Sequence, residues 1–306
     1  MSKKTVYGVV GPTASGKTAV SLLLAQALGG ELLCMDSMQI YRGMDIGTAK
    51  PTEAERQVAP HHLLDIVEPT EPFTVTQYVE RARKVIERVP VPILVGGTGF
   101  YLRGLSLPMD FGFVEGAAEV RRRYERIAEV EGKAALHRLL RERDPISAER
   151  LHENDVRRVV RALEVQELTG RPFSSQTMPG YEDADYDFRL FAVSWPRELL
   201  YERADQRVEE MLRQGLLKEV QSLLDAGVPP EAQAMQGIGY KELIPVCRGD
   251  MDLSAAKALI QQRTRNYAKR QLTWFRADPR IVWLPADQGD TAQDIFSALN
   301  GRLRGV

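Results

Sequence analysis

Residues 9–20, VVGPTASGKTAV, have the types and spacing that can hold a polyphosphate. Gly11 is followed by Gly16, Lys17 and Thr18, which fits the spacing G-x-x-x-x-G-K-[ST]. In such a loop the glycines let backbone N–H groups close around an anion, the lysine neutralises terminal oxygens and the hydroxyl binds Mg²⁺. The motif predicts a bound polyphosphate but does not say which molecule carries it.

The sequence on both sides of this motif supports that interpretation. A short apolar run at 6–10 predicts a strand, and the apolar residues of 18–28 predict a buried helix. The loop would therefore lie between a strand and the N-terminus of a helix, which is a favourable place for an anion. A chance glycine turn is the alternative, and it explains neither the spacing nor the context.

Asp36 is the first candidate for a catalytic group outside the loop. It follows the apolar run ELLCM at 31–35, so its carboxylate is expected at the same sheet edge as the phosphate loop. A carboxylate there could act as a general base toward a nucleophile. The alternative is an aspartate that only binds a turn or caps the next element.

The next apolar run, at 91–95, ends in Gly96, Gly97 and Thr98 rather than in an acidic residue. Phosphate-loop ATPases usually carry a carboxylate at such a position, so a motor or a water-activating NTPase is disfavoured. Thr98 could place its hydroxyl near the reacting centre. It could equally be the N-cap of a helix that follows a simple glycine turn.

Residues 257–276 carry basic side chains and no acidic one. Such a stretch suggests a polyanionic partner, and the aromatic residues within it could stack on unpaired bases. A plain basic helix face is the alternative. The basic residues are Lys257, Arg263, Arg265, Lys269, Arg270 and Arg276, and the aromatic ones are Tyr267, Trp274 and Phe275.

The composition sets limits on class and compartment. The chain has 306 residues with 41 basic and 42 acidic ones, so affinity for nucleic acid has to come from local clusters. Cys34 and Cys247 lack a metal-type spacing, and a reduced, cytoplasmic location fits them. No apolar run approaches the roughly 18 residues that a membrane span needs. His61 and His62 lack a third ligand at suitable spacing, so we expect them to be structural.

Apolar segments that alternate with helical patterns predict an α/β fold: a P-loop-containing parallel sheet flanked by helices. The predicted strands include 188–195 and 280–285, and the predicted helices include 73–89, 253–276 and one long helix over 197–227. The charged helical stretch between them predicts an inserted all-helical domain at 110–187. The catalytic core would then comprise 1–109 and 188–306.

Several strings together resemble those of bacterial tRNA dimethylallyltransferases. They run in that family's order from near residue 9 to near residue 276: GPTASGKT, DSMQIYRGMDIGTAKP, HHLLDIVEP, LVGGTGFY, NDVRRVVRALEV, GIGYKE and YAKRQLTWFR. The resemblance implies transfer of a dimethylallyl group from dimethylallyl diphosphate, with Mg²⁺. The acceptor would be the exocyclic amine (N6) of the adenine 3′-adjacent to the anticodon, in tRNAs reading codons that begin with U.

The resemblance also implies roles for individual residues. Asp36 would be the base, Thr98 would lie at the reaction centre, and Lys17 and Arg207 would stabilise the leaving diphosphate. From helical periodicity alone, Arg207 could instead be a surface partner of Glu210. The diphosphate cradle would consist of Gly11, Thr13, Ala14, Ser15, Gly16, Lys17 and Thr18 together with Arg207, with Thr18 near Mg²⁺.

The implied partners are dimethylallyl diphosphate and the anticodon stem-loop of tRNA, with no membrane, and we expect a monomer. The helical insert and the basic helix would hold the loop. The residues implied to contact tRNA are Asp36, Ser37, Met38, Gln39, Thr98, Arg121, Arg157, Arg158, Val159, Val160, Arg161, Gln236, Gly237, Ile238, Gly239, Tyr240, Lys241, Lys269 and Arg270.

Three other functions remain open from the residues. A small-molecule kinase would bind ATP and place phosphate on its acceptor. A prenyltransferase acting on free adenine nucleotides would not need the basic, aromatic helix around Tyr267. A non-catalytic RNA-binding module is the third alternative.

Overall fold

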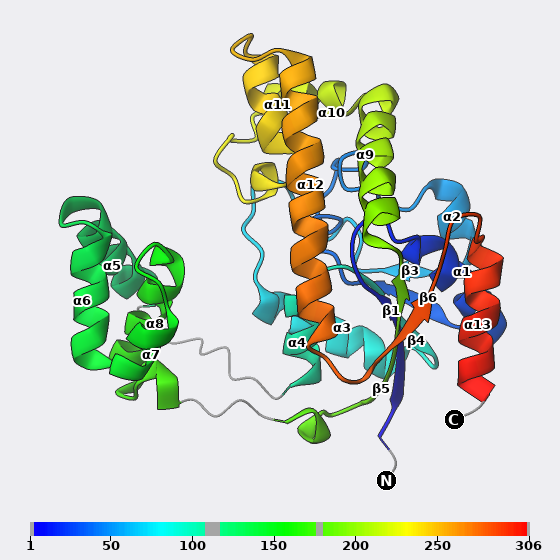
Figure 1. Ribbon diagram of the computed structural model, residues 1–306, viewed down its shortest axis with the longest axis horizontal. Helices are drawn as coiled ribbons and strands as arrows, with labels where there is room; N and C mark the ends of the chain where they lie inside the picture. Colours follow the sequence, from blue (N-terminus) through cyan, green and yellow to red (C-terminus); the bar gives the residue numbers. More distant parts are fainter. Residues whose placement is uncertain (1–2, 108–116, 176–179, 305–306) are drawn as a thin grey trace. The chain divides into compact units, whose positions relative to one another are not determined.

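The computed structural model describes residues 3–107, 117–175 and 180–304 (Figure 1). The chain divides into two compact units, one formed by Met1–Leu107 with Ala184–Val306 and the other by Pro108–Asp183. The bounds of the predicted insert, 110–187, nearly coincide with those of the second unit.

The larger unit is built on a six-stranded sheet in which every neighbouring pair is parallel. The strand order β3-β2-β4-β1-β5-β6 confirms the predicted α/β class with a parallel sheet. The two-residue edge strand β3, which contains both neighbouring histidines, was not predicted. The strands are β1 (Thr5–Val10), β2 (Glu31–Cys34), β3 (His61–His62), β4 (Pro92–Gly96), β5 (Asp187–Ser194) and β6 (Ile281–Pro285).

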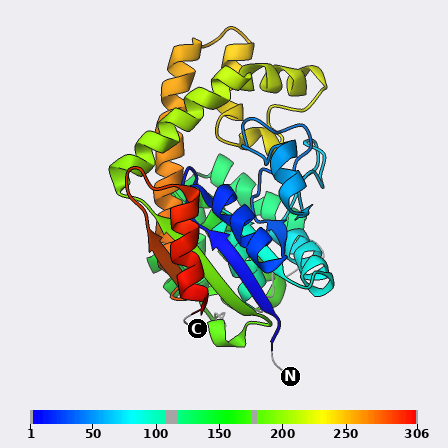
Figure 2. The same cartoon turned by 90° about the vertical axis from the view of Figure 1, so that its right-hand side faces the viewer.

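Helices cover both faces of this sheet, which explains why its strands are almost continuously apolar. The helices α1 (Lys17–Leu28) and α13 (Ala292–Arg304) lie on one face, as Figure 2 shows, over Val9, Leu32 and Phe191. The other face packs against α3 (Val75–Arg88) and α4 (Gly99–Ser106).

The helix α3 shows how the sequence specifies one of these layers. Its buried residues Tyr78, Ala82 and Ile86 recur at helical spacing, and Thr74 and Gln77 form a capping box at its start. The aromatic ring of Tyr78 stacks on that of Tyr101 in α4, with the ring centroids 4.0 Å apart. These contacts confirm the predicted helix and fix it beside β2, where the Tyr78 hydroxyl donates to the Cys34 carbonyl.

Further helices extend from the end of the sheet where the phosphate loop lies (Figure 1). The prediction of one helix over 197–227 is wrong, because Gly215 takes a left-handed conformation with φ 105° and ends the first segment. The helices α9 and α12 run side by side. The elements concerned are α2 (Glu53–Val58), α9 (Arg197–Gln214), α10 (Leu216–Asp225), the short 3₁₀ segment η3 (Ala234–Gln236), α11 (Tyr240–Cys247) and α12 (Leu253–Arg276).

The smaller unit is helical in the part that the structure describes. A core of its own includes Tyr124, Leu136, Leu140 and Leu163, each 0 or 1% exposed. Gly170 ends the last helix in a left-handed conformation, as its position predicted. Its elements are α5 (Ala117–Val130), α6 (Lys133–Arg143), α7 (Pro145–Arg150), α8 (Val156–Thr169) and the 3₁₀ turns η1 (Phe173–Ser175) and η2 (Tyr181–Asp183).

Among the residues described in either unit, no helix combines the length and the apolar character needed to cross a bilayer.

Candidate active site

The phosphate loop connects β1 to α1, as predicted, and its turns include positive φ values and a hydrogen bond within the loop. Gly11, Ala14 and Gly16 have positive φ values of 128°, 62° and 85°. The Ser15 hydroxyl donates to the Pro12 carbonyl at 2.9 Å. Because these turns are fixed by backbone geometry, the amides that lead into α1 are preorganised for an anion.

Two side chains from outside the loop bind its carbonyl groups. Trp195 Nε1 donates to the Ser15 carbonyl at 3.0 Å, and Arg203 Nε donates to the Ala14 carbonyl at 3.0 Å. The Arg203 guanidinium also lies over the Trp195 ring, 4.2 Å from its centroid. Trp195, directly after β5, and Arg203 of α9 therefore restrain the loop.

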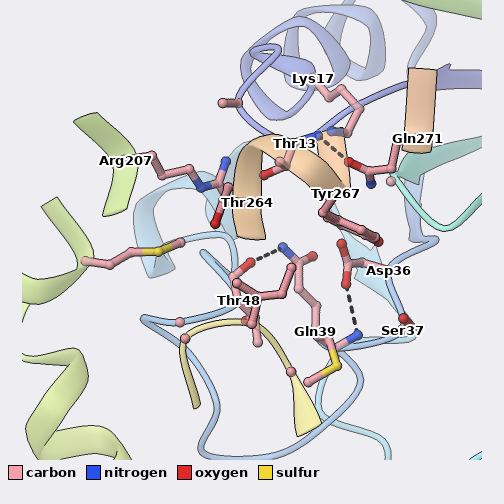
Figure 3. Close-up of a pocket in the computed structure, with 18 of the residues that line it drawn as sticks. Thr13, Lys17, Asp36, Ser37, Gln39, Thr48, Arg207, Thr264, Tyr267 and Gln271 are labelled. Carbon is pink, nitrogen blue, oxygen red and sulfur yellow. Dashed lines mark hydrogen bonds between the residues drawn. The ribbon is translucent and has the colours of Figure 1, made fainter. Parts of the chain in front are cut away.

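A cavity of about 400 Å³ opens beside the loop within the larger unit (Figure 3). Most of the predicted site residues of this unit line it. They are Thr13, Ala14, Gly16, Lys17, Thr18, Asp36, Ser37, Met38, Gln39, Arg207, Gln236, Gly237, Ile238, Gly239, Lys241 and Arg270. The lining does not include Gly11, Ser15, Thr98, Tyr240 or Lys269.

Two cationic side chains converge on this cavity. Burial and the neighbouring Arg207 lower the pKa of Lys17 to about 7, while Asp36 raises it. Burial lowers the pKa of Arg207, and Asp36 opposes the shift. The buried Arg207 Nε atom has no hydrogen-bond partner among the described residues. Lys17, Arg207 and the Asp36 carboxylate thus interact electrostatically within one cavity.

Arg207 is therefore not a surface partner of Glu210. Glu210 instead pairs with Arg213 one turn further along α9. Arg207 lines the same cavity as Lys17, and Figure 3 shows both side chains. The alternative drawn from helical periodicity alone is wrong.

Asp36 lies just beyond β2 and both faces the cavity and holds a turn. Its Oδ1 accepts the Met38 backbone N–H at 2.9 Å. The backbone N–H of Ser37, between Asp36 and Met38, donates to Thr98 Oγ1 at 3.0 Å. Thr98 occupies the N-cap position of α4, but its side chain does not cap that helix. The threonine hydroxyl supports the segment that carries Asp36 instead of lining the cavity.

The segment after Asp36 is held by buried polar contacts. Gln39 Nε2 donates to the carbonyls of Thr48 and Ala49, both at 3.0 Å. Lys50 Nζ donates to the Tyr41 carbonyl at 2.8 Å and pairs with the carboxylates of Asp45 and Asp65 at 2.5 and 2.6 Å. The segment is fixed by contacts within itself as well as by the sheet.

The carboxylate of Glu219 in α10 holds the same segment from the other side. It accepts the backbone N–H groups of Asp45, Ile46 and Gly47 at 2.7–3.1 Å. The Tyr240 hydroxyl donates to it at 2.6 Å. Tyr240, 1% exposed, is thus a support for this carboxylate. Its burial does not fit the predicted contact with tRNA through its side chain.

The helix α12 contributes a wall of the cavity that the sequence predictions did not assign. Ile260, Thr264, Tyr267 and Gln271 all line the cavity and follow one another at helical spacing. Figure 3 places Tyr267 between Gln271 and Asp36. Burial and the negative charge of Asp36 raise the pKa of Tyr267, so the phenol stays neutral. The helical spacing was the available signal, but nothing in the sequence showed which face turns inward.

The basic stretch in α12 is more balanced than its sequence suggested. Lys257 pairs with Glu209 at 2.9 Å, and Arg265 pairs with Asp205 at 2.6 Å, both partners belonging to α9. Arg263 pairs with the buried Glu242 of α11. Three of the six positive charges are therefore paired with acids of other helices, although residues 257–276 themselves contain no acidic residue.

The remaining cations of α12 differ from these paired residues. Lys269, Arg270 and Arg276 are exposed, and no ion pair is found for them among the described residues. The Arg270 guanidinium lies over the Tyr267 ring, 5.6 Å from its centroid. The exposed cations without an ion pair among the described residues thus lie in the later part of α12. One of them, Arg270, lines the cavity.

In the smaller unit, the predicted contact residues fall into two groups. Arg121 and Arg161 both pair with Glu164, whose side chain is fully buried. Val159 and Val160 belong to the core of the unit, with exposures of 0 and 2%, so tRNA contact through these two side chains does not fit the structure. The side chains of Arg157 and Arg158 are exposed, and Arg158 lies 3.3 Å from Asp155.

Each of the two histidines of β3 has a hydrogen-bonding partner within the protein. His61 Nδ1 lies 2.8 Å from the Ala59 carbonyl, and His62 Nε2 lies 2.6 Å from Glu31. His61 lines the cavity, and burial lowers its pKa. Among the residues that the structure describes, no three His, Cys, Asp or Glu side chains lie close enough together to hold a metal ion.

A phosphate loop on a parallel sheet, two cavity-facing cations and a carboxylate at a strand end together define a phosphate-loop transferase. The IPP transferase family model matches residues 39–278, and the Isopentenyl transferase model matches residues 4–65. A tRNA dimethylallyltransferase of Desulfitobacterium hafniense (strain DSM 10664 / DCB-2) is 43% identical over 99% of this chain and 98% of its own length. The chain belongs to the IPP transferase family.

Solved structures agree with this assignment. The full-length tRNA isopentenylpyrophosphate transferase of Bacillus halodurans is 37% identical, with a TM-score of 0.73 over 99% of this chain and 98% of that chain. A eukaryotic dimethylallyltransferase, described as acting on tRNA, is 28% identical with a TM-score of 0.81, over 99% of this chain and 80% of that chain. The protein is thus an enzyme of the prenyltransferase class.

Proposed function

We propose that the protein transfers a dimethylallyl group from dimethylallyl diphosphate to tRNA and releases diphosphate. The acceptor is the N6 amine of the adenine 3′-adjacent to the anticodon, in tRNAs reading codons that begin with U. The family and the names of its relatives support the transfer. The observation that carries the proposal is the convergence of Lys17, Arg207 and Asp36 on one cavity.

The donor half of the reaction uses the cations of the cavity. An aromatic amine is a weak nucleophile, so the allylic carbon must gain positive character as the diphosphate leaves. Lys17, Arg207 and the loop amides stabilise the negative charge that develops on that leaving group. Val208, Met211 and Ile260 supply apolar surface to the same cavity, which suits a five-carbon hydrocarbon group.

The acceptor half uses the carboxylate of Asp36. It takes a proton from the adenine amine as the new C–N bond forms, and general-base help of this kind is worth about 10²–10⁴-fold. One of its oxygens is already held by the Met38 N–H, which fixes the orientation of the group. The other oxygen is the one that receives the proton.

Residues of both units bind the anticodon stem-loop. The exposed cations Lys269 and Arg270, together with the cavity segment 236–241, contact the RNA loop. The smaller unit adds contacts through Arg157 and Arg158. Extruding a stacked adenine costs a few kcal/mol, which these contacts offset.

Mg²⁺ accompanies the diphosphate. The donor set fits this ion, because Thr18, which carries a hydroxyl, lines the cavity and Mg²⁺ is usually held by few protein ligands together with substrate phosphates and waters. The described residues offer no three-residue cage that would hold a metal without substrate. When bound, the ion supplies additional positive charge to the leaving group.

The test is an incubation of the protein with labelled dimethylallyl diphosphate, unmodified tRNA and Mg²⁺, followed by nucleoside analysis. We expect N6-dimethylallyladenosine at the predicted position and release of diphosphate. ATP supplied as a competing donor is expected to leave the RNA unphosphorylated. A phosphorylated product without prenylated adenosine would instead identify a kinase.

A further inference from the structure

The side-chain amide of Gln271 connects two loops of the cavity. Gln271 projects from α12 and is 5% exposed. Its Oε1 accepts the Thr13 backbone N–H at 2.8 Å, and its Nε2 donates to the Gly97 carbonyl at 2.8 Å. Figure 3 shows the first of these bonds. One buried amide therefore joins the loop after β1 to the loop after β4.

The position of Gly97 depends on this amide. A Cβ atom at residue 97 would lie 2.2 Å from Gln271 Nε2, which is closer than such atoms approach in real structures. Gly97 does not have a left-handed φ. The absence of a side chain at residue 97 thus lets the amide approach closely, with no special backbone angle involved, and a methyl group there would displace the end of the Gln271 side chain.

The contacts continue from Gly97 toward Asp36. Thr98 follows Gly97, and its backbone N–H donates to the Met35 carbonyl at 3.1 Å. The Thr98 hydroxyl accepts the Ser37 N–H at 3.0 Å. Met35 and Ser37 flank Asp36 in the chain. An uninterrupted path of hydrogen bonds and peptide groups therefore runs from the phosphate loop through Gln271 to the carboxylate.

We infer that Gln271 is a positioning residue that sets the separation between the diphosphate loop and the Asp36 carboxylate; this rests on the proposed function. Its two hydrogen bonds are made to the protein backbone, so the amide acts through the loops that it joins. In a transfer reaction, displacing one reactant by about 1 Å can cost about 10² in rate. Loss of the amide should therefore lower the rate of transfer more than the binding of either substrate.

The first test is Gln271→Glu, which keeps the size and the acceptor for Thr13. The carboxylate places an oxygen opposite the Gly97 carbonyl and so removes the donated bond. We expect kcat for prenyl transfer to fall about 10- to 100-fold. The KM for tRNA should stay within about threefold, and the loss of affinity for inorganic diphosphate that the added negative charge causes should be smaller than the loss of kcat. Gln262→Glu is the control, because it adds the same charge at an exposed position of α12.

The second test is a double-mutant cycle of Gly97→Ala and Gln271→Ala. The alanine at 97 displaces the amide, whereas the smaller side chain at 271 leaves the Gly11 carbonyl, 3.2 Å away, as the nearest atom to the added methyl group. We expect each single variant to lose kcat and the double variant to lose no more than the worse of the two. If Gln271→Glu has a lowered melting temperature, this cycle still tests whether Gln271 and Gly97 act on kcat through one contact.

The outcomes separate the inference from the function on which it rests. Wild-type protein that transfers no dimethylallyl group contradicts the proposed function and the inference with it. Active wild-type protein with an equally active, folded Gln271→Glu variant contradicts the inference alone. Losses that simply add in the cycle, or that appear in diphosphate binding as much as in kcat, also contradict it.

Discussion

At the scale of single residues, Asp36 combines two roles. Its Oδ1 holds the Met38 N–H, and its carboxylate faces the same cavity as Lys17 and Arg207. An asparagine can still accept the Met38 N–H through its carbonyl oxygen. It loses only the negative charge and the basicity, so the two roles can be separated by one substitution.

We expect Asp36→Asn to retain tRNA affinity within a few-fold while product formation falls at least about a hundredfold. Single-turnover transfer and filter binding measure the two quantities on the same preparation. Asp36→Ala serves as the comparison, because it also removes the turn. Unchanged turnover in the asparagine variant would exclude Asp36 as the base.

The pKa of Lys17, lowered to about 7 by burial and Arg207, predicts a pH dependence. Below pH 7 the free enzyme carries the charged lysine, and above it the lysine becomes neutral. The affinity for inorganic diphosphate should therefore fall as the pH rises above about 7, beyond the change caused by the titration of the ligand itself.

Calorimetric titration from pH 6 to 9 measures this effect. Lys17→Arg is the reference, because an arginine keeps its charge over this range and shares the titration of the ligand. We expect the ratio of wild-type to variant affinity to decrease with pH. A constant ratio would show that Lys17 stays charged throughout.

At the scale of elements, α12 contributes both to the cavity wall and to the charged surface of the larger unit. One of its faces lines the cavity, and Lys257 and Arg265 bind it to α9. Exposed cations without an ion pair among the described residues lie further along the helix at Lys269 and Arg270. The same helix can thus stabilise the core and present a charged surface to RNA.

Replacing Lys269 and Arg270 by Gln together should weaken tRNA binding and reduce the slope of log affinity against log salt by about 1 to 2. Diphosphate binding should not change. Binding isotherms at several salt concentrations measure this slope. The control replaces Lys257 and Lys218 by Gln, which removes the same charge elsewhere. Equal slopes for wild type and the Lys269/Arg270 variant would place the RNA on a different face.

The sequence indicated the parts of the site whose signals are local. The loop spacing, the strand-end position of Asp36 and the apolar strands all depend on neighbouring residues. Gln271 was missed because its partners, Thr13 and Gly97, lie far away in the chain. The acids that pair with α12 were missed for the same reason, and the break at Gly215 was hidden by continuing helical periodicity.

At the scale of the whole molecule, the chain divides into two units with separate cores. Leu163 is fully buried in the core of the smaller unit, and none of that core's members belongs to the sheet. Packing lost in one unit should therefore leave the geometry of the phosphate loop intact. This separation allows the role of the smaller unit to be tested in the full chain.

Leu163→Ala should lower the free energy of unfolding of the smaller unit by about 2–5 kcal/mol. We expect weaker tRNA binding and unchanged diphosphate binding. Hydrogen exchange of the two units and both affinities measure the effect. Ile146→Ala, at a position 52% exposed in the same unit, is the control and should cost less than about 0.5 kcal/mol. Undiminished tRNA affinity, with the unit destabilised, would mean that the RNA binds without it.

The sheet topology has a consequence for synthesis of the chain on the ribosome. The ladder between β1 and β4, with Tyr7 opposite Ile93, can form early, whereas the ladder between β1 and β5, with Thr5 opposite Asp187, must wait for the whole insert. During that interval the nascent protein exposes a central strand with one open edge, where chaperones or other chains can attach. Slow translation of the insert should lengthen this vulnerable period.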